Sequence, residues 1–164
     1  LAALTGVDLN SLPESFAEAI FNYPNSAAEW VVVKRGPAGA LLVTRDGHAV
    51  AVGCPEVKVG DTVGCGDSSA AAYVLGYLRA RADASLDIGE ALETTVTLAT
   101  HVGSATAMNV GAGRNVARAE TVLDLLNQGA TGKTRGVSKV AAAAARSVLK
   151  DAIARRLVDP VQVV

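Results

Sequence analysis

The stretch DTVGCGDSSAAA, residues 61–72, constrains the fold most, because two glycines stand directly ahead of a run of small, helix-forming residues. Two interpretations are open. In the first, the glycines only turn the chain, and Asp67 is an acidic residue in the first turn of a helix. In the second, the small residues Gly64, Cys65 and Gly66 leave backbone N–H groups accessible, and the positive end of the helix then completes an anion-binding turn.

The second interpretation assigns a specific chemistry to Asp67. A carboxylate at an anion site cannot itself bind a phosphate group, because the like charges repel. Its sensible role is to accept a proton from a hydroxyl that attacks the γ-phosphate of a nucleotide. The N–H groups of residues 64–66 would stabilise the charge that builds up on the transferring phosphoryl group.

Strand patterns precede this turn. The apolar, β-branched run at residues 30–33 predicts a buried strand. A turn at residues 35–39 leads to a second strand at residues 40–44. Asp46 and Gly47 give the hairpin signal before a return strand at residues 48–52.

Helical patterns dominate after the turn. We expect Ser11 and Ser85 to be the N-caps of the helices that follow them. Strands that lead into helix N-termini predict an α/β fold with a phosphate site at their junction. The helices are expected at residues 13–21, 67–81, 88–108, 119–127 and 139–157.

Composition excludes several classes of protein. The 164 residues are 50% hydrophobic and 19% charged, which suits one domain with a core. The formal net charge of -1 argues against a general nucleic-acid binder, and no apolar run is long enough to span a membrane. The chain begins Leu-Ala-Ala, so no targeting segment is visible, and something upstream is expected to have been removed. We expect an intracellular protein of the cytoplasm or plastid.

The cysteines and histidines give weaker signals. Cys54 and Cys65 are not spaced as a CxxC pair and are too few for a structural zinc site, so we expect two free thiols. A helix N-terminus lowers the pKa of a thiol, which would make Cys65 sensitive to oxidation, whereas the simpler interpretation is a small residue that fits the turn. His48 and His101 stand alone and are expected to be structural.

The segment DTVGCGDSSAAAYV resembles the second signature of the ribokinase or pfkB family of carbohydrate and nucleoside kinases. That signature has Asp, Thr, any residue, two small residues, Gly and the catalytic Asp. Cys65 stands where Ala or Ser is more usual, and Ser69 stands where many members have an aromatic residue. The matching residues are Asp61, Thr62, Gly64, Gly66, Asp67, Ala71 and Ala72.

The segment VVVKRGPAGALLV is similar to the strand, turn and strand that hold the nucleotide in this family. Lys34 replaces a frequent Thr, and it could either pair with phosphate or be solvated. Thr100 stands where the family often has Asn. The resemblance implies Asp67 as the base, with Gly64, Cys65 and Gly66 as the anion hole. It implies ATP binding by Lys34, Arg35, Gly36, Pro37, Ala38, Gly39, Gly66, Asp67 and Thr100.

The segment TLATHVGSATAMNVGAGRN looks like the helix on the adenine side of the family's site and the loop that follows. ATP and Mg²⁺ are the implied cofactors. Members that use a monovalent cation such as K⁺ hold it between two loops. The corresponding residues are Asp61, Val63, Thr106, Asn109, Gly111 and Asn115.

The resemblance also sets the domain organisation. Residues 1–127 are expected to form the C-terminal part of a ribokinase-like, three-layer αβα domain, with a linker at 128–138 and an extra helix and tail at 139–164. In the family the N-terminal half supplies the lid, most sugar-binding residues and the Asn and Glu that organise magnesium, and none of these is visible here. We therefore expect this chain alone to be inactive and to need that half or a partner, such as a second copy.

Two functions remain open. The first is an ATP-dependent kinase that phosphorylates a hydroxyl of a sugar or nucleoside, with fructose, ribose and adenosine among the candidate substrates. The second is a non-catalytic scaffold or regulatory subunit. Intact Asp67 and Gly66 favour the first, since a scaffold needs neither. The C-terminal helix is either a partner-binding helix or an ordinary solvated one.

Overall fold

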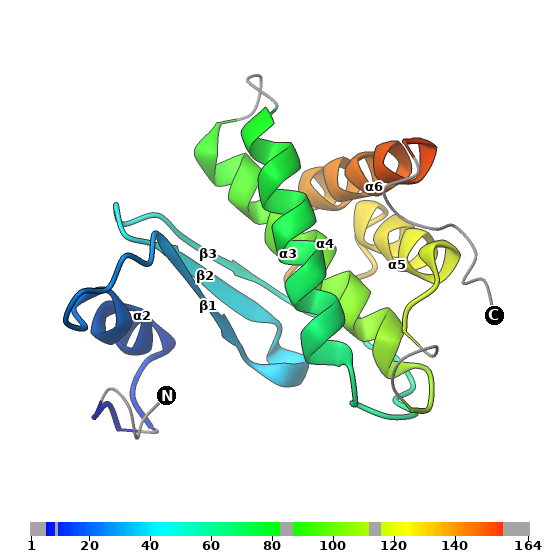
Figure 1. Cartoon of the computed structure of the whole chain (residues 1–164). Helices are drawn as coiled ribbons and strands as arrows, with labels where there is room; N and C mark the ends of the chain where they lie inside the picture. Colours follow the sequence, from blue (N-terminus) through cyan, green and yellow to red (C-terminus); the bar gives the residue numbers. More distant parts are fainter. Residues whose placement is uncertain (1–5, 9, 83–86, 112–115, 156–164) are drawn as a thin grey trace.

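The computed structural model of the chain describes residues 6–8, 10–82, 87–111 and 116–155 (Figure 1). One described helix precedes the strands and the others follow them, as expected for this partial α/β fold. The 3₁₀ turn η1 (Gly36–Ala38) joins the first two strands. The described elements are α2 (Pro13–Phe21), β1 (Trp30–Lys34), β2 (Ala40–Thr44), β3 (Ala49–Val52), α3 (Cys65–Ala82), α4 (Ile88–Ala107), α5 (Ala119–Ala130) and α6 (Lys139–Ala154).

The three described strands form an antiparallel sheet in the order β1–β2–β3. Lys34 is paired with Ala40, and Ala40 is paired with Val52, so these three side chains share one face of the sheet. Leu41 lies on the other face. Because α2 packs on β1 and β2 while α4 packs on β2 and β3, the sheet lies between helices (Figure 1).

The expectation that β1 is buried is wrong. Its first four residues are only half-buried, whereas the first three residues of β2 are fully buried. The difference follows from position, because β1 is at an edge of the described sheet and β2 has a strand on each side.

The N-caps also differ from the expectation. Leu12, not Ser11, is the N-cap of α2, because Pro13 fixes the first helical position and forces an extended backbone on the residue before it. Asp87 caps α4 by accepting a hydrogen bond from the N–H of Glu90 at 3.0 Å. Ser85, the predicted cap, lies outside the described residues.

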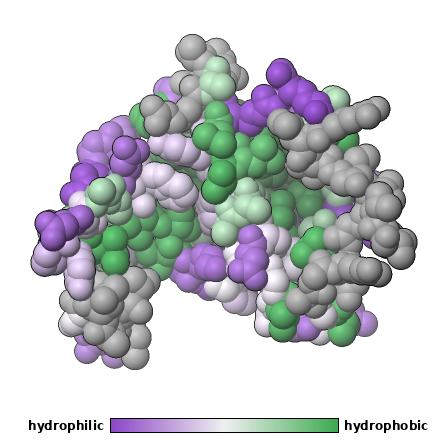
Figure 2. Space-filling view, in the orientation of Figure 1, coloured by the Kyte–Doolittle hydropathy of each residue, from purple (hydrophilic) through white to green (hydrophobic). Residues whose placement is uncertain are grey.

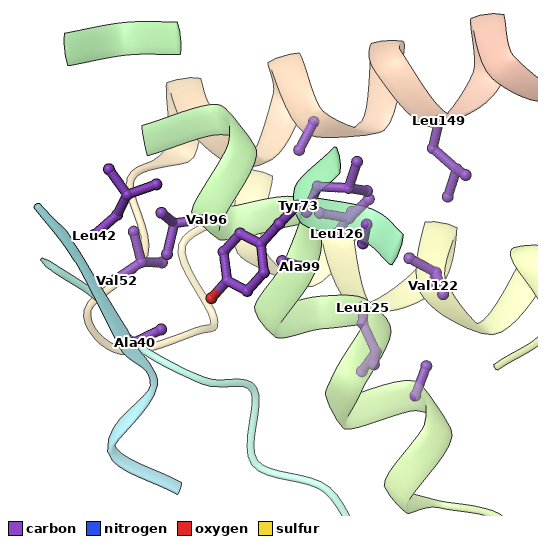
Figure 3. Packing of buried hydrophobic residues seen from close by; sticks show 14 of the residues in the cluster. Ala40, Leu42, Val52, Tyr73, Val96, Ala99, Val122, Leu125, Leu126 and Leu149 are labelled. Atoms are coloured by element: carbon purple, nitrogen blue, oxygen red, sulfur yellow. The ribbon is translucent and has the colours of Figure 1, made fainter. Parts of the chain in front are cut away.

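Helix α4 is the centre of the molecule, because it packs against α3, α5, α6 and two of the strands. In Figure 3, Tyr73 of α3 lies between the strands and Ala99 of α4, and its hydroxyl oxygen is turned toward the strands. Burial raises the pKa of this hydroxyl. The core extends from Val52 on β3 to Leu126 on α5 and Leu149 on α6.

The alanine-rich face of α6 is covered within the chain. Residues 141, 142, 145, 149 and 152 are buried, and α6 packs against α4 and α5. Ser138 caps the helix by accepting a hydrogen bond from the N–H of Ala141 at 3.3 Å. The preceding segment is tied to the end of β3, since the N–H of Gly53 donates to the carbonyl of Gly136 at 2.7 Å.

One surface of the molecule carries exposed apolar side chains. Figure 2 shows hydrophobic residues at the centre of the view, where α3 crosses the molecule in Figure 1. Val74 and Leu78 of α3 are exposed. Within the described residues, no helix is both long enough and apolar enough to cross a membrane.

His101 is fully buried in α4, with its Nδ1 2.7 Å from the carbonyl oxygen of Thr97. Burial lowers its pKa from 6.5 to about 4. Since the unfolded chain binds more protons between these values, stability should fall as the pH drops from 6.5 to about 4. We expect His101→Gln to flatten the pH dependence of the melting temperature over this window. Parallel curves for the variant and the wild type would contradict this.

Candidate active site

A cavity of about 620 Å³ lies between the β1–β2 turn, the loop after β3, the start of α3 and one face of α4. Sequence segments that are far apart meet in its wall. Several residues singled out in the sequence line it together, namely Lys34, Gly36, Pro37, Gly39, Cys65, Gly66 and Thr100. Arg35, Ala38, Gly64 and Asp67 belong to the same segments but do not line it.

The β1–β2 turn forms one side of the cavity. Its backbone closes through a hydrogen bond from the N–H of Arg35 to the carbonyl of Gly39 at 2.8 Å. Gly39 has φ 85° and ψ −138°, a conformation that only glycine adopts readily. The tight turn exposes backbone on the cavity side.

Helix α4 supplies the opposite side. Thr100 donates its hydroxyl hydrogen to the carbonyl of Thr97 at 3.0 Å, and the Ser104 hydroxyl lies 2.9 Å from the thiol sulfur of Cys54. The sequence analysis singled out Thr100 but missed Gly103, Ser104 and Ala107. They follow Thr100 by three, four and seven residues, a spacing that places them on one helical face and could have identified them.

The loop after β3 was also missed. Cys54, Pro55, Glu56, Val57 and Val59 line the cavity from this loop, and Ser69 and Tyr73 line it from α3. The loop carries no regular pattern that marks it in the sequence. Its part in the cavity depends on how β3 is placed against α4.

Helix α3 begins at Cys65, two residues earlier than predicted. The N–H of Cys65 donates to the carbonyl of Thr62, and the N–H of Ser68 donates to Gly64, so the helical bonds begin within the glycine-containing turn. Within the part of the chain that the structure describes, the N–H groups of Gly66 and Asp67 have no acceptor. Asp67 is exposed in the first turn, next to these free donors.

The thiol of Cys65 does not have the lowered pKa that a helix N-terminus would give. Burial raises its pKa, and the negative charge of Asp61 raises it further. Desolvation and the nearby carboxylate therefore outweigh the positive end of the helix. Both cysteines are free thiols, as expected.

Asp61 joins the two loops that were predicted to hold a cation. Its Oδ1 accepts a hydrogen bond from the N–H of Val63 at 3.1 Å, and its Oδ2 accepts one from Gly111 at 3.0 Å. Thr106 lies nearby but donates its hydroxyl hydrogen to the carbonyl of Val102 in its own helix, and the side-chain amide of Asn109 donates to the carbonyl of Ala105. Asn115 lies outside the described residues.

These hydrogen bonds lower the pKa of Asp61, the one from Val63 most and the one from Gly111 next. A carboxyl group with a lowered pKa stabilises the fold above its unfolded pKa of 3.8 and loses this effect as the pH falls through the folded value. Asp61→Asn should therefore have a lower melting temperature than the wild type at neutral pH, and this difference in melting temperature should become smaller toward pH 3. A difference in melting temperature that does not change with pH would contradict the stabilising role of this carboxylate.

Comparison with known proteins now places this fold and cavity in a family. The sequence model of the pfkB family carbohydrate kinases matches residues 1–119. The chain belongs to the pfkB family. A curated relative, the bifunctional ribokinase/ribose-5-phosphate isomerase A of Fructilactobacillus sanfranciscensis, is 28% identical over 144 residues, which cover 88% of this chain and 25% of the relative.

Solved structures agree with this assignment. Phosphofructokinase-2 from Escherichia coli, in complex with potassium, is 29% identical with a TM-score of 0.58, and the match covers 76% of this chain and 36% of that one. Ribokinase of Arabidopsis thaliana, complexed with ribose and ATP, has a TM-score of 0.61 at 23% identity and shows the same fold over 76% of this chain and 37% of its own. This pfkB chain thus spans about a third of the length of these proteins.

Proposed function

We propose that the complete protein is an ATP-dependent kinase that phosphorylates a hydroxyl of a sugar or nucleoside, and that this chain carries its nucleotide site and catalytic base. The observation that carries the proposal is the meeting of the Lys34–Gly39 turn, the start of α3 and Thr100 of α4 around one cavity. The chain covers 36% of the phosphofructokinase-2 structure and 25% of the curated relative. In this proposal, the residues that bind the acceptor belong to other parts of the complete protein.

The cavity suits the non-reacting part of a nucleotide. Gly36, Gly39 and Gly103 contribute only backbone to its wall, and a flat base can approach these residues closely. Thr100 and Ser104 supply hydroxyl groups along the α4 side. The phosphate chain would then extend toward the start of α3.

The start of α3 suits the transferring phosphoryl group. The free N–H groups of Gly66 and Asp67 point out of the helix and carry its positive end, so they would stabilise charge that develops on this group. The exposed Asp67 carboxylate would accept the proton of the attacking hydroxyl. Gly64 and Cys65 shape the turn that presents these donors.

Magnesium and a monovalent cation belong to the same proposal. Among the residues with described positions, no group of three His, Cys, Asp or Glu side chains could hold a metal ion. In this proposal Mg²⁺ would be held largely by nucleotide phosphates and water. Backbone carbonyls of the loops joined by Asp61 would supply oxygen ligands for a potassium-like ion.

Photoaffinity labelling of the complete protein with an azido analogue of ATP tests the location of the nucleotide. We expect labelled peptides from residues 34–39, 54–59 or 100–107, and we expect unlabelled ATP to suppress the labelling. Labelling confined to other segments, or labelling that excess ATP does not suppress, would contradict the proposed site.

A further inference from the structure

Two cysteines line the cavity from different elements, and the proposed phosphate transfer uses neither of their thiol groups. Cys54 lies in the loop after β3, and Cys65 begins α3. Both thiols are free and both residues are only half-buried, so the pair is not sealed inside the core. Two accessible thiols in the wall of one cavity are a candidate site for reversible oxidation.

The two cysteines contact neighbouring residues of α4. The thiol sulfur of Cys54 lies 2.9 Å from the hydroxyl oxygen of Ser104. Gly103 lets the start of α3 come close, since a Cβ atom added there would lie 3.5 Å from the carbonyl oxygen of Cys65. Consecutive residues of one helix therefore bring both cysteines to the same part of the cavity wall. Burial and the charge of Asp61 raise the pKa of the Cys65 thiol, and a deprotonated Cys54 raises this pKa further, as expected for neighbouring thiols.

The loop that carries Cys54 has few backbone restraints. Residues 53–64 form no helix or strand. The N–H of Gly53 donates to the carbonyl of Gly136 at 2.7 Å, and the N–H of Gly60 donates to the end of α4 at 2.8 Å. Between these two points, residues 54–59 make no backbone-to-backbone hydrogen bond within the described part of the chain. This stretch can therefore shift toward α3 without breaking such a bond.

We propose that a peroxide oxidises Cys54 and Cys65 to a reversible disulfide and that this bond closes the cavity to the nucleotide. The inference rests on the proposed function for the identity of the excluded ligand, whereas the pairing of the thiols does not depend on it. The bond would join the loop after β3 to the start of α3, beside the place proposed for the phosphate chain. Disulfides that form transiently in reducing compartments commonly have such a regulatory role.

The oxidation consumes one peroxide molecule. The Cys54 thiolate attacks one oxygen of hydrogen peroxide: an S–O bond forms, the O–O bond breaks, and the other oxygen takes up a proton and leaves as water. The Cys65 thiol then attacks the sulfur of this sulfenic acid. The S–S bond forms, the S–O bond breaks, and a second water leaves with the thiol proton. In total, two electrons pass from the sulfurs to the peroxide.

The surroundings of the two thiols set the order of these steps. The thiolate is the form of cysteine that attacks a peroxide, and the raised pKa of Cys65 keeps its thiol protonated. The Ser104 hydroxyl can instead donate a hydrogen bond to a thiolate at Cys54. Cys54 is therefore the residue that reacts with the peroxide, and Cys65 is the residue that completes the disulfide.

Peptide mapping of the complete protein tests the pairing. The protein is oxidised with hydrogen peroxide, its remaining thiols are alkylated, and it is digested with trypsin. Lys58 lies between the two cysteines, so the disulfide would join peptide 46–58 to peptide 59–79. We expect this linked pair after oxidation, its loss after treatment with dithiothreitol, and slower formation in the presence of ATP. Absence of the linked pair from oxidised protein, or a bond from either cysteine to a different one, would overturn the proposal.

ATP titration of the same samples tests the effect on the cavity. We expect oxidation to weaken ATP binding of the wild type about tenfold or more, because few linked molecules adopt the conformation that admits the nucleotide. Dithiothreitol should restore the affinity. Cys54→Ser and Cys65→Ser, each compared with its own unoxidised sample, should lose this reversible effect. Met108→Leu is the control for oxidation of an exposed methionine, and it should respond to peroxide as the wild type does.

The outcomes separate this inference from the kinase proposal. Linked protein that binds ATP as tightly as reduced protein would overturn the closing of the cavity. A reversible loss of affinity that persists in either serine variant would overturn the role of this pair. If the reduced wild type is folded and binds no ATP, the kinase proposal and the control of nucleotide binding both fail, and the linked peptides still decide whether the thiols pair. Melting temperatures show whether each variant is folded.

Discussion

Asp67→Asn in the complete protein is expected to lower the turnover number by about 10²–10⁴-fold, the range for removal of a general base. Asn has nearly the same shape but cannot accept the proton of the attacking hydroxyl. The N–H groups of Gly66 and Asp67 remain in place, so ATP should still bind with similar affinity. The measurement is steady-state transfer of phosphate from ATP to the best acceptor in a panel of sugars and nucleosides, together with ATP titration.

An exposed acid elsewhere provides the control. Asp124 lies exposed on α5, and it does not line the cavity. Asp124→Asn should leave both turnover and ATP binding unchanged. Turnover that survives in Asp67→Asn would exclude this carboxylate as the base, and a complete wild-type protein that binds ATP without transferring phosphate would favour the scaffold interpretation.

The elements of the fold were largely predictable from the sequence because local patterns determine them. The β-branched run at residues 30–33, the Asp-Gly hairpin and the helical spacing of apolar residues each appear in the structure close to the expected positions. Caps were less predictable, since Pro13 makes Leu12 the N-cap of α2 in place of the expected Ser11. The cap depends on one backbone conformation, which a pattern of side-chain types does not encode.

The lining of the candidate site was predicted at two recognisable turns and at Thr100 of α4. Gly36–Gly39 and Gly64–Gly66 can be identified in the sequence because glycines mark unusual backbone. The loop from Cys54 to Val59 and the position of the Lys34 ammonium group depend on packing between β3, α3 and α4. The raised pKa of Cys65 likewise depends on burial and on Asp61, neither of which appears in the local sequence.

The largest expected loss of stability comes from Gly39→Ala in the turn that forms the cavity wall. The added Cβ would overlap the carbonyl oxygen of Val52 and lie 2.8 Å from the carbonyl carbon of Gly53. Both are backbone atoms at the end of β3, so neither can move aside cheaply. Alanine also strongly disfavours φ 85° with ψ −138°. We expect a loss of about 3 kcal/mol or more in the free energy of unfolding, measured by urea denaturation.

Gly36→Ala in the same turn is the matched control. Gly36 also has a positive φ, 57°, but no other atom lies within 4 Å of its added Cβ. Its cost should be limited to the backbone preference, about 1 kcal/mol. The difference between the two variants therefore combines the contact between the turn and β3 with the greater backbone strain at Gly39. Equal losses would show that this contact does not hold the turn in place. Gly39 lines the cavity and lets the β1–β2 turn lie close to the end of β3. Gly39→Ala should therefore also weaken ATP binding more than Gly36→Ala does.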